Sequence, residues 1–251
     1  MNSISKIILS TFVLYAAVAF AQNVTSNKEG NELLKKIDRN LTPVAFESLR
    51  KLINIEPDGK KKEFVLYTAK KGNDKMVTTF LSPKTEVGRS TLRLGDNMWL
   101  YIPNVGKPVR ITSMQSVTGG IFNNADIMRL DYSEEYDCIT LDKSGKEPVM
   151  TLKAKTGNVA YDKLIMTVDK KNTVPIRIEC YTASDMLIKT LYFKDIKPLS
   201  KNITRPAVIE TDSPLHKGYK SVMIYANMKI REFPDEVFTM QYMSKIPDLR
   251  D

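Results

Sequence analysis

The chain has 251 residues, of which 42% are hydrophobic, and its 38 Lys and Arg residues outnumber its 29 Asp and Glu residues to give a net charge of +9. That length suits one large all-β domain or two small domains. The single histidine excludes a metal site built on several histidines.

The first residues have the pattern of an export signal. Lys6 supplies a positive charge, residues 7–20 form a largely apolar stretch, and residues 19–21 fit the small-x-small cleavage rule. We therefore expect a signal peptide over residues 1–21 and one mature domain over residues 22–251 in the periplasm. An uncleaved membrane anchor is the alternative, but the apolar run is shorter than the roughly twenty residues that span a bilayer.

Residues 28–41 predict a helix. Their apolar side chains recur at helical spacing on one face, with charged residues opposite, at Leu33, Leu34, Ile37 and Leu41. Thr42-Pro43 then ends the pattern, because proline lacks the amide hydrogen that a helix interior needs. The rest of the chain shows no comparable helical period.

From residue 46 onward, short extended runs alternate with Gly, Pro, Asn and Asp, which is typical of an antiparallel sandwich or barrel. Pro57-Asp58-Gly59 is the clearest turn between two of these runs. With no linker and no internal repeat, we predict one continuous, strongly bent sheet of eleven strands, give or take two. The runs lie near residues 49–56, 62–70, 75–82, 90–94, 98–102, 109–112, 136–142, 149–154, 163–169, 174–182, 188–196, 205–210 and 220–231.

The run from Met98 to Ile102 is apolar on both faces, whereas a strand with water on one side alternates. Both faces must therefore be out of water. In a curved sheet, one face then lies in the concave interior and the other lies beneath a helix or loop, and a wide interior becomes a ligand cavity. We assign Trp99 and Tyr101 to the interior, with ordinary core packing as the alternative.

The stretch at residues 113–136 has no strand period, although it lies in mid-sheet. Gly119-Gly120 gives it freedom, and its apolar side chains are too many for a solvent loop: Ile121, Phe122, Ile127, Met128 and Leu130. Such a segment forms either a lid over an interior space or a short helix that closes the core.

Catalytic motifs are absent from the sequence. His216 lies in a turn-like "SPLHKG" segment without a Gly-x-Ser-x-Gly elbow, and no phosphate-binding glycine loop is present. We therefore expect no enzyme, no cofactor and no metal. Cys138 and Cys180 lie in strand-like runs, where a disulfide and two buried thiols are equally natural.

The segment "FLSPKTEVGRSTLRLGDNMWLYIPNVGKPVRITS", and above all its Gly95-Asp96-x-x-Trp99-x-Tyr101-x-Pro103 motif, resembles the outer-membrane lipoprotein-sorting family related to the periplasmic carrier LolA. The resemblance continues through "NNADIMRLDY" and "RPAVIETDSPLHKGYKSVMIYANMKI" to "PDEVFTMQYM", and it covers most of residues 46–243.

This resemblance implies a mainly β fold, an unclosed antiparallel barrel of about eleven strands with helices as a lid over its mouth. It also implies a carrier that binds the acyl chains of lipoproteins or phospholipids without covalent chemistry, with residues 113–130 as the lid. The implied partners are an inner-membrane transporter as donor and an outer-membrane acceptor, and no nucleic acid. The candidate cavity and lid residues are Leu92, Leu94, Trp99, Tyr101, Met114, Ile121, Phe122 and Met128.

One departure from the family concerns lid control. Carriers of the LolA type have an arginine, which contacts the closed lid, immediately before the proline of the motif that reads Leu81-Ser82-Pro83 here. Ser82 replaces that arginine, so neither the lid control nor the partner-driven loading of those carriers transfers to this chain. The alternative function is an envelope-stress sensor of the same fold that binds a membrane protein. A hydrolase is a third reading.

Overall fold

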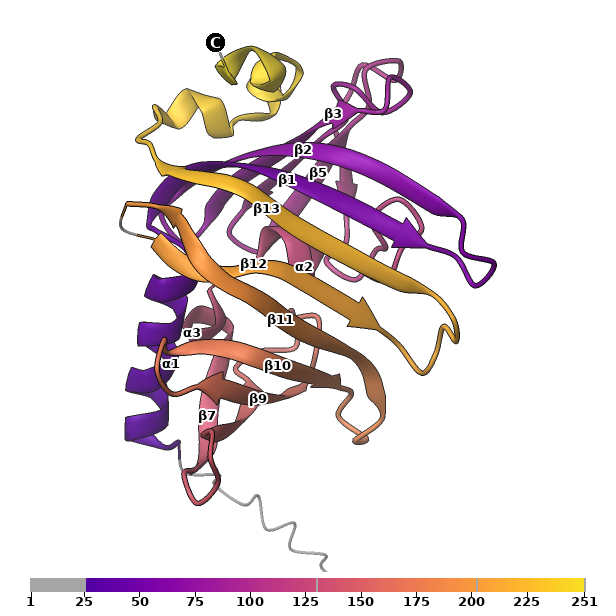
Figure 1. The fold of residues 1–251 in the computed structure, drawn as a ribbon. Helices are drawn as coiled ribbons and strands as arrows, with labels where there is room; N and C mark the ends of the chain where they lie inside the picture. The colour runs from indigo at the N-terminus through magenta and orange to yellow at the C-terminus, as the bar shows by residue number, and fades with distance from the viewer. Residues whose placement is uncertain (1–25, 130, 202, 251) are drawn as a thin grey trace, which may run out of the picture.

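A computed structural model describes residues 26–129, 131–201 and 203–250. The predicted signal peptide and its cleavage point lie outside the described residues. Thirteen strands form one antiparallel sheet that curves around two short helices (Figure 1). The strands are β1 (Ala45–Ile55), β2 (Lys61–Lys71), β3 (Lys75–Ser82), β4 (Ser90–Leu94), β5 (Asn97–Tyr101), β6 (Val109–Ile111), β7 (Tyr136–Asp142), β8 (Val149–Ala154), β9 (Lys163–Asp169), β10 (Val174–Tyr181), β11 (Leu187–Ser200), β12 (Ile203–Asp212) and β13 (Lys220–Ile230). The helices are α1 (Lys28–Leu41), α2 (Asn124–Met128), α3 (Tyr132–Glu135) and the 3-10 helices η1 (Asp235–Phe238) and η2 (Met240–Arg250).

The predicted fold class is confirmed: the chain is mainly β, with one unclosed antiparallel sheet, an N-terminal helix and short helices in mid-chain. Thirteen strands lie at the upper end of the predicted range. Each predicted extended run corresponds to one strand, because turn residues separate the runs in the sequence.

The strand order is β6-β5-β4-β3-β2-β1-β13-β12-β11-β10-β9-β8-β7. The first and last strands of the chain pair antiparallel from Phe46 opposite Ile230 to Ile55 opposite Lys220. This central pairing places β6 and β7 at the two opposite edges of the sheet, although they are consecutive strands in the sequence. The chain between them must therefore cross from one edge to the other, and it does so on the concave face.

The predicted helix is present as α1, and it covers one end of the sheet beside β7, β10 and β12 (Figure 1). The Asn27 side chain accepts a hydrogen bond from the Gly30 amide at 2.8 Å and caps its first turn. Leu34, Ile37 and Leu41 are buried. Gly30 is required for this packing, because a Cβ there would lie 2.2 Å from the Cys138 sulfur.

Two apolar clusters lie on opposite faces of the sheet, since side chains alternate along each strand. The concave core joins α1 and α2 to strands from both halves of the sheet and includes Phe64, Phe80 and Met98. The second cluster, here called the convex cluster, forms where η1 and η2 pack over β3, β4 and β5. Figure 1 shows these C-terminal turns beside the β3 end of the sheet.

Both cysteines are buried free thiols, so the alternative of a Cys138–Cys180 disulfide is not realised. Cys138 packs against α1 on one edge strand, and Cys180 lies on β10 in the concave core. Burial raises the pKa of the Cys138 thiol to about 11, which keeps it protonated and poorly reactive at neutral pH.

The convex cluster generates a prediction about stability. Met243 is fully buried in it, whereas Met240, three residues earlier, is 43% exposed. Met243→Ala should lower the free energy of unfolding by about 2–4 kcal/mol because it leaves a cavity. The control Met240→Ala should change it by less than about 0.5 kcal/mol. Urea unfolding followed by Trp99 fluorescence measures both, since Trp99 is the single tryptophan and packs against the same cluster. Equal effects of the two substitutions would mean that η2 is not anchored there.

Candidate functional site

The concave face is covered by residues 113–129, here called the lid segment. Phe122, Ile127 and Met128 of this segment are buried in the concave core. Asn123 begins α2 with a reciprocal capping box, in which its side chain accepts from the Asp126 amide and Asp126 accepts from the Asn123 amide. The predicted irregular, partly helical segment in mid-chain is therefore present, and its apolar residues face the sheet.

A buried ion pair joins α2 to β11. The Lys189 ammonium lies 2.7 Å from an Asp126 carboxylate oxygen, and both side chains are less than 5% exposed. Lys189 also donates to the Ile121 carbonyl at 2.7 Å. The Tyr161 hydroxyl donates to the other Asp126 oxygen at 2.8 Å and accepts from the Asn123 amide group at 2.9 Å. Each charge therefore has the partners that burial demands.

Arginines of the sheet bind the backbone at the end of α2. Arg50 on β1 donates to the Ile127 carbonyl at 3.2 Å, and Arg93 on β4 donates to the Met128 carbonyl at 3.3 Å. These carbonyls lie in the last turn of a helix, where no intrahelical donor reaches them. Although Ser82 stands in place of the arginine of LolA-type carriers, the lid segment is thus held by cations from other strands.

Tyr225 lies against two buried arginines on the concave face. The Arg205 guanidinium carbon is 3.9 Å from the centre of its ring, and that of Arg50 is 5.8 Å away on the paired strand β1. Burial by itself would raise the pKa of the Tyr225 hydroxyl, but the positive charges of Arg205 and Arg50 lower it overall. Positive potential is therefore concentrated at this point of the wall.

The space between the lid segment and the sheet is almost filled. One cavity of about 30 Å³ lies against Phe122, Leu191, Phe193, Arg205 and Tyr225. A second cavity of about 30 Å³ lies on the other side of Asp126, beside Tyr161 and Cys180. Neither cavity is large enough for an acyl chain.

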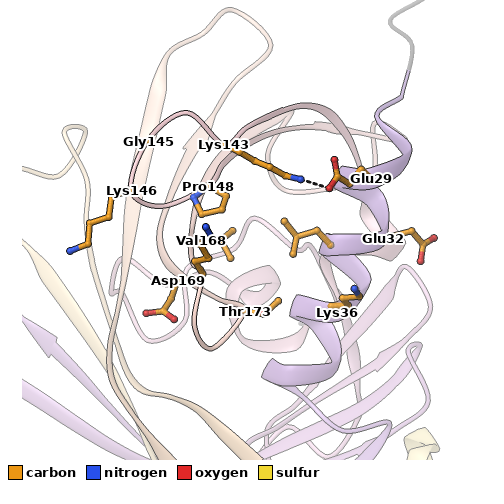
Figure 2. Close-up of a pocket in the computed structure, with 12 residues that line it drawn as sticks. Glu29, Glu32, Lys36, Lys143, Gly145, Lys146, Pro148, Val168, Asp169 and Thr173 are labelled. Atoms are coloured by element: carbon orange, nitrogen blue, oxygen red, sulfur yellow. Dashed lines mark hydrogen bonds and ion pairs between the residues drawn. The ribbon is translucent and has the colours of Figure 1, made fainter.

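The larger hollows lie at the surface. One groove has a volume of about 430 Å³ and is lined by α1 and the turns after β7 and β9. Figure 2 shows its lining residues, with the Lys143–Glu29 ion pair across it. Another hollow of about 650 Å³ lies near the Lys155 and Ala183 loops. Both are open and lined by charges of both signs, which does not suit acyl chains. Leu33 and Val168, in the floor of the first groove, adjoin the concave core.

The structure divides the eight predicted site residues into two groups. Ile121, Phe122 and Met128 are buried on the lid segment, and Met114 of the same segment is 49% exposed. The others pack beneath η1 and η2 in the convex cluster: Leu92, Leu94, Trp99 and Tyr101.

The assignment of Trp99 and Tyr101 to the interior is therefore wrong. The prediction that both faces of their strand are out of water holds in part: Met98 is buried in the concave core, whereas Leu100, two residues on along the same face, is only half-buried. The C-terminal turns cover the other face.

Sequence reasoning missed the charged side chains of the concave wall. Arg50 shares a strand face with Phe46 and Leu52, two apolar residues at even spacing from it. This alternation of buried and less buried residues along β1 could have revealed the buried charge, because it places the Arg50 guanidinium on the apolar face. Lys189 and Arg205 stand beside apolar residues in the same way.

Within the residues that the structure describes, no helix is long and apolar enough to cross a membrane. The same part of the chain holds no group of three or more His, Cys, Asp or Glu residues arranged for a metal ion.

Comparison with known proteins gives a family match and close structural neighbours. Residues 72–245 match the model of a family described as "Uncharacterized protein". No curated protein matches the chain. Among solved structures, a LolA superfamily protein from Nitrosomonas europaea is similar at 27% identity and a TM-score of 0.76, with 84% of this chain and 97% of that chain covered.

Two more distant structures share the fold. A DUF1329 family protein from Desulfovibrio piger has 22% identity and a TM-score of 0.74, with 86% of this chain and 98% of that chain covered. A domain from Vibrio parahaemolyticus, whose name assigns it to outer membrane lipoprotein sorting, has 18% identity and a TM-score of 0.71 with the same coverage. The fold predicted from the sequence resemblance is thus confirmed by its structural neighbours.

The buried ion pair predicts how the lid segment is held. Asp126→Asn leaves the Lys189 ammonium without a charged partner, which should lower the free energy of unfolding by about 3–5 kcal/mol. Hydrogen exchange of the amides in residues 121–129 should accelerate. The control Glu210→Gln breaks the exposed Lys194–Glu210 pair and should cost less than about 1 kcal/mol. Unchanged exchange in the Asp126 variant would show that the pair does not hold the lid segment.

Asp38 on α1 predicts a pH effect. It accepts hydrogen bonds from the Tyr132 and Ser133 amides at 2.9 and 2.7 Å, yet burial raises its pKa to about 6. Because the folded pKa exceeds the unfolded value, the protonated form stabilises the fold below about pH 4 and this contribution is lost as the pH rises through 6. Relative to Asp38→Asn, the natural protein should lose on the order of 2 kcal/mol of unfolding free energy between pH 4 and 7. Urea unfolding of both proteins at each pH tests this, and a pH-independent difference contradicts it.

Proposed function

Since this chain belongs to the family matched over residues 72–245 and has the LolA superfamily fold, we propose that it carries acylated molecules, lipoproteins or lipids, toward the outer membrane. The acyl chains are buried between the concave face of the sheet and the lid segment. The periplasm is the compartment of this carrier, with an inner-membrane protein as donor and an outer-membrane protein as acceptor. The partner-driven loading of LolA-type carriers is not part of the proposal. The proposal involves no nucleic acid.

The observation that carries this proposal is the apolar packing of the lid segment on the concave face. Phe122, Ile127 and Met128 fill the interior that strands from both halves of the sheet enclose. An acyl chain that displaces them regains the buried area at about 0.8 kcal/mol for each methylene. Loading then replaces the apolar side chains of the lid segment by an acyl chain in the same interior. The net free energy of binding is therefore small, and the cargo is released readily.

The site supports binding without covalent chemistry. His216 lies in an exposed turn between β12 and β13, where its amide donates to the Ser213 carbonyl at 3.1 Å. Three cations of the concave face hold the lid segment: Lys189 through its ion pair with Asp126, and Arg50 and Arg93 through hydrogen bonds to backbone carbonyls. Their role in the proposal is to hold and release that segment.

Lipid bound to the protein purified from its own envelope tests the proposal. Native mass spectrometry, followed by organic extraction, should find an acylated ligand at about one per chain. A ligand-free mass, with no uptake of added phospholipid or lipoprotein, contradicts the carrier function.

A pair of aromatic substitutions tests the location of the site. Phe122→Asp places a charge among the apolar side chains of the lid segment, so the lipid-bound fraction should fall at least about fivefold. Trp99→Phe changes the convex cluster on the opposite face and should leave it unchanged. Circular dichroism confirms that both variants keep the sheet. Loss of lipid in the Trp99 variant alone would place the cargo on the convex face.

A further inference from the structure

Two arginines of the concave face are buried without an anionic partner. Arg50 and Arg205 are 1% and 2% exposed. Among the described residues, no carboxylate lies within 4.0 Å of either guanidinium. Two other buried cations differ: Lys70 pairs with Asp131 at 3.0 Å and Lys189 with Asp126 at 2.7 Å. A third, Arg93, also lacks a carboxylate partner in the described part of the chain, but it donates to three backbone carbonyls at the surface end of its strand, those of Gly95, Asn73 and Met128. A buried charge without a counter-charge is costly, so its presence calls for a reason.

The neighbours of the two arginines are neutral. Arg50 donates to the hydroxyls of Thr68 and Thr78 and to the Ile127 carbonyl. Arg205 donates to the Leu41 and Pro206 carbonyls at 2.5 and 3.2 Å. These bonds and the contacts with the Tyr225 ring fix the guanidinium groups in place, but none of them supplies a carboxylate counter-charge.

Unused hydrogen-bonding groups lie at the same place. Among the described residues, the Nε of Arg50 and the hydroxyls of Ser48 and Thr42 are buried without a hydrogen-bond partner. Ser48 precedes Arg50 by two residues and shares its strand face. Thr42 lines the same small cavity as Arg205 and Tyr225. The concave face of the sheet thus has unused hydrogen-bond donors and two positive charges that could bind an anionic ligand.

The surroundings of this cavity are amphipathic. Beside Arg205 and Thr42, its lining consists of apolar side chains of β11 and the lid segment, among them Leu191, Phe193 and Phe122. Asp126, which also reaches the cavity, belongs to α2 and departs if the lid segment lifts. The sheet would then present two guanidinium groups at one end of an apolar wall.

We propose that Arg50 and Arg205 bind the phosphate of an anionic phospholipid, whose acyl chains lie along the apolar wall beside them. This inference rests on the proposed carrier function and names the class of its cargo. The planar guanidinium fork matches phosphate oxygens in bidentate hydrogen bonds. Both arginines lie against the Tyr225 ring, and the unpartnered hydroxyls of Ser48 and Thr42 are further donors for the phosphate.

The test offers the purified protein vesicles that contain equal amounts of dioleoyl phosphatidylglycerol and dioleoyl phosphatidylcholine. The two lipids have the same chains and both carry a phosphodiester, but the choline cation neutralises that of phosphatidylcholine. Two guanidinium groups without a carboxylate partner should therefore favour phosphatidylglycerol, whose net headgroup charge is negative. After removal of the vesicles, native mass spectrometry counts each bound lipid. The natural protein should take up phosphatidylglycerol in preference by about tenfold, the effect of one charge-assisted contact.

Two variants localise the preference. Arg50→Met and Arg205→Met should each bring the ratio of the two lipids close to one while total uptake is retained. The matched control Lys229→Met removes an equal charge from an exposed position of β13 and should keep the natural ratio. Each arginine variant should also have an equal or higher melting temperature without lipid, because it removes an unneutralised buried charge. A lower melting temperature with an unchanged lipid ratio would mean that the arginines are only structural.

The remaining outcomes distinguish failure of the headgroup site from failure of the proposed carrier function. Equal uptake of both lipids by the natural protein overturns the headgroup site but leaves the carrier intact, and this comparison needs no variant. Uptake of neither lipid overturns the carrier function and the inference together. Glycerol 3-phosphate is the third arm: if it raises the melting temperature as much as phosphatidylglycerol does, the site binds a water-soluble phosphate and the lipid assignment is wrong.

Discussion

The pairing of β1 with β13 is the constraint on which the rest of the molecule depends. Because the first strand of the sheet is bonded to the last, the two halves of the chain extend outward from a shared centre, and β6 and β7 become opposite edges. The chain that connects them has no route except across the sheet. The strand order therefore explains why a connecting segment crosses the sheet at all. The apolar residues of the lid segment explain why this crossing is stable on the concave face.

The concave face combines two kinds of surface that are rarely placed together. Its apolar side chains form one continuous core with α1 and α2, while cations from five strands point into the same space: Arg50, Lys70, Arg93, Lys189 and Arg205. Lys70 and Lys189 meet carboxylates, and Arg50 and Arg93 bind carbonyls at the end of α2. The attachment of the covering segment is therefore mainly polar, whereas its contact area is mainly apolar. The polar contacts fix the lid segment in one position on the sheet, because hydrogen bonds and ion pairs are directional. The apolar contacts are less specific, so another apolar group of similar volume can replace them.

Sequence patterns predicted the elements of this fold well and their faces poorly. Leu34, Ile37 and Leu41 define α1 because a helix with one buried side has a visible period, and turn residues delimit the strands for a similar reason. Trp99 shows the limit: a strand that is apolar on both sides gives no sign of which side is concave. The face that carries Trp99 is covered by Met243 and its neighbours near the C-terminus. These residues form 3-10 turns, which have no apolar period that a sequence analysis could recognise. The buried charges were missed because their meaning depends on distant partners, such as Asp126 for Lys189, which spacing does not reveal.

The open sheet has two edges, and an exposed edge is a template on which another chain can add as a strand. On β7 this risk is reduced by α1, since the Asn27 amide donates to the Cys138 carbonyl at 2.7 Å and the Asn31 side chain accepts from the Cys138 amide at 2.7 Å. On β6 the edge is only three residues long and carries the exposed Arg110. The N-terminal helix thus protects against aggregation as well as covering one end of the core. A sheet that does not close on itself is in this way kept from adding copies of the same chain at its edges.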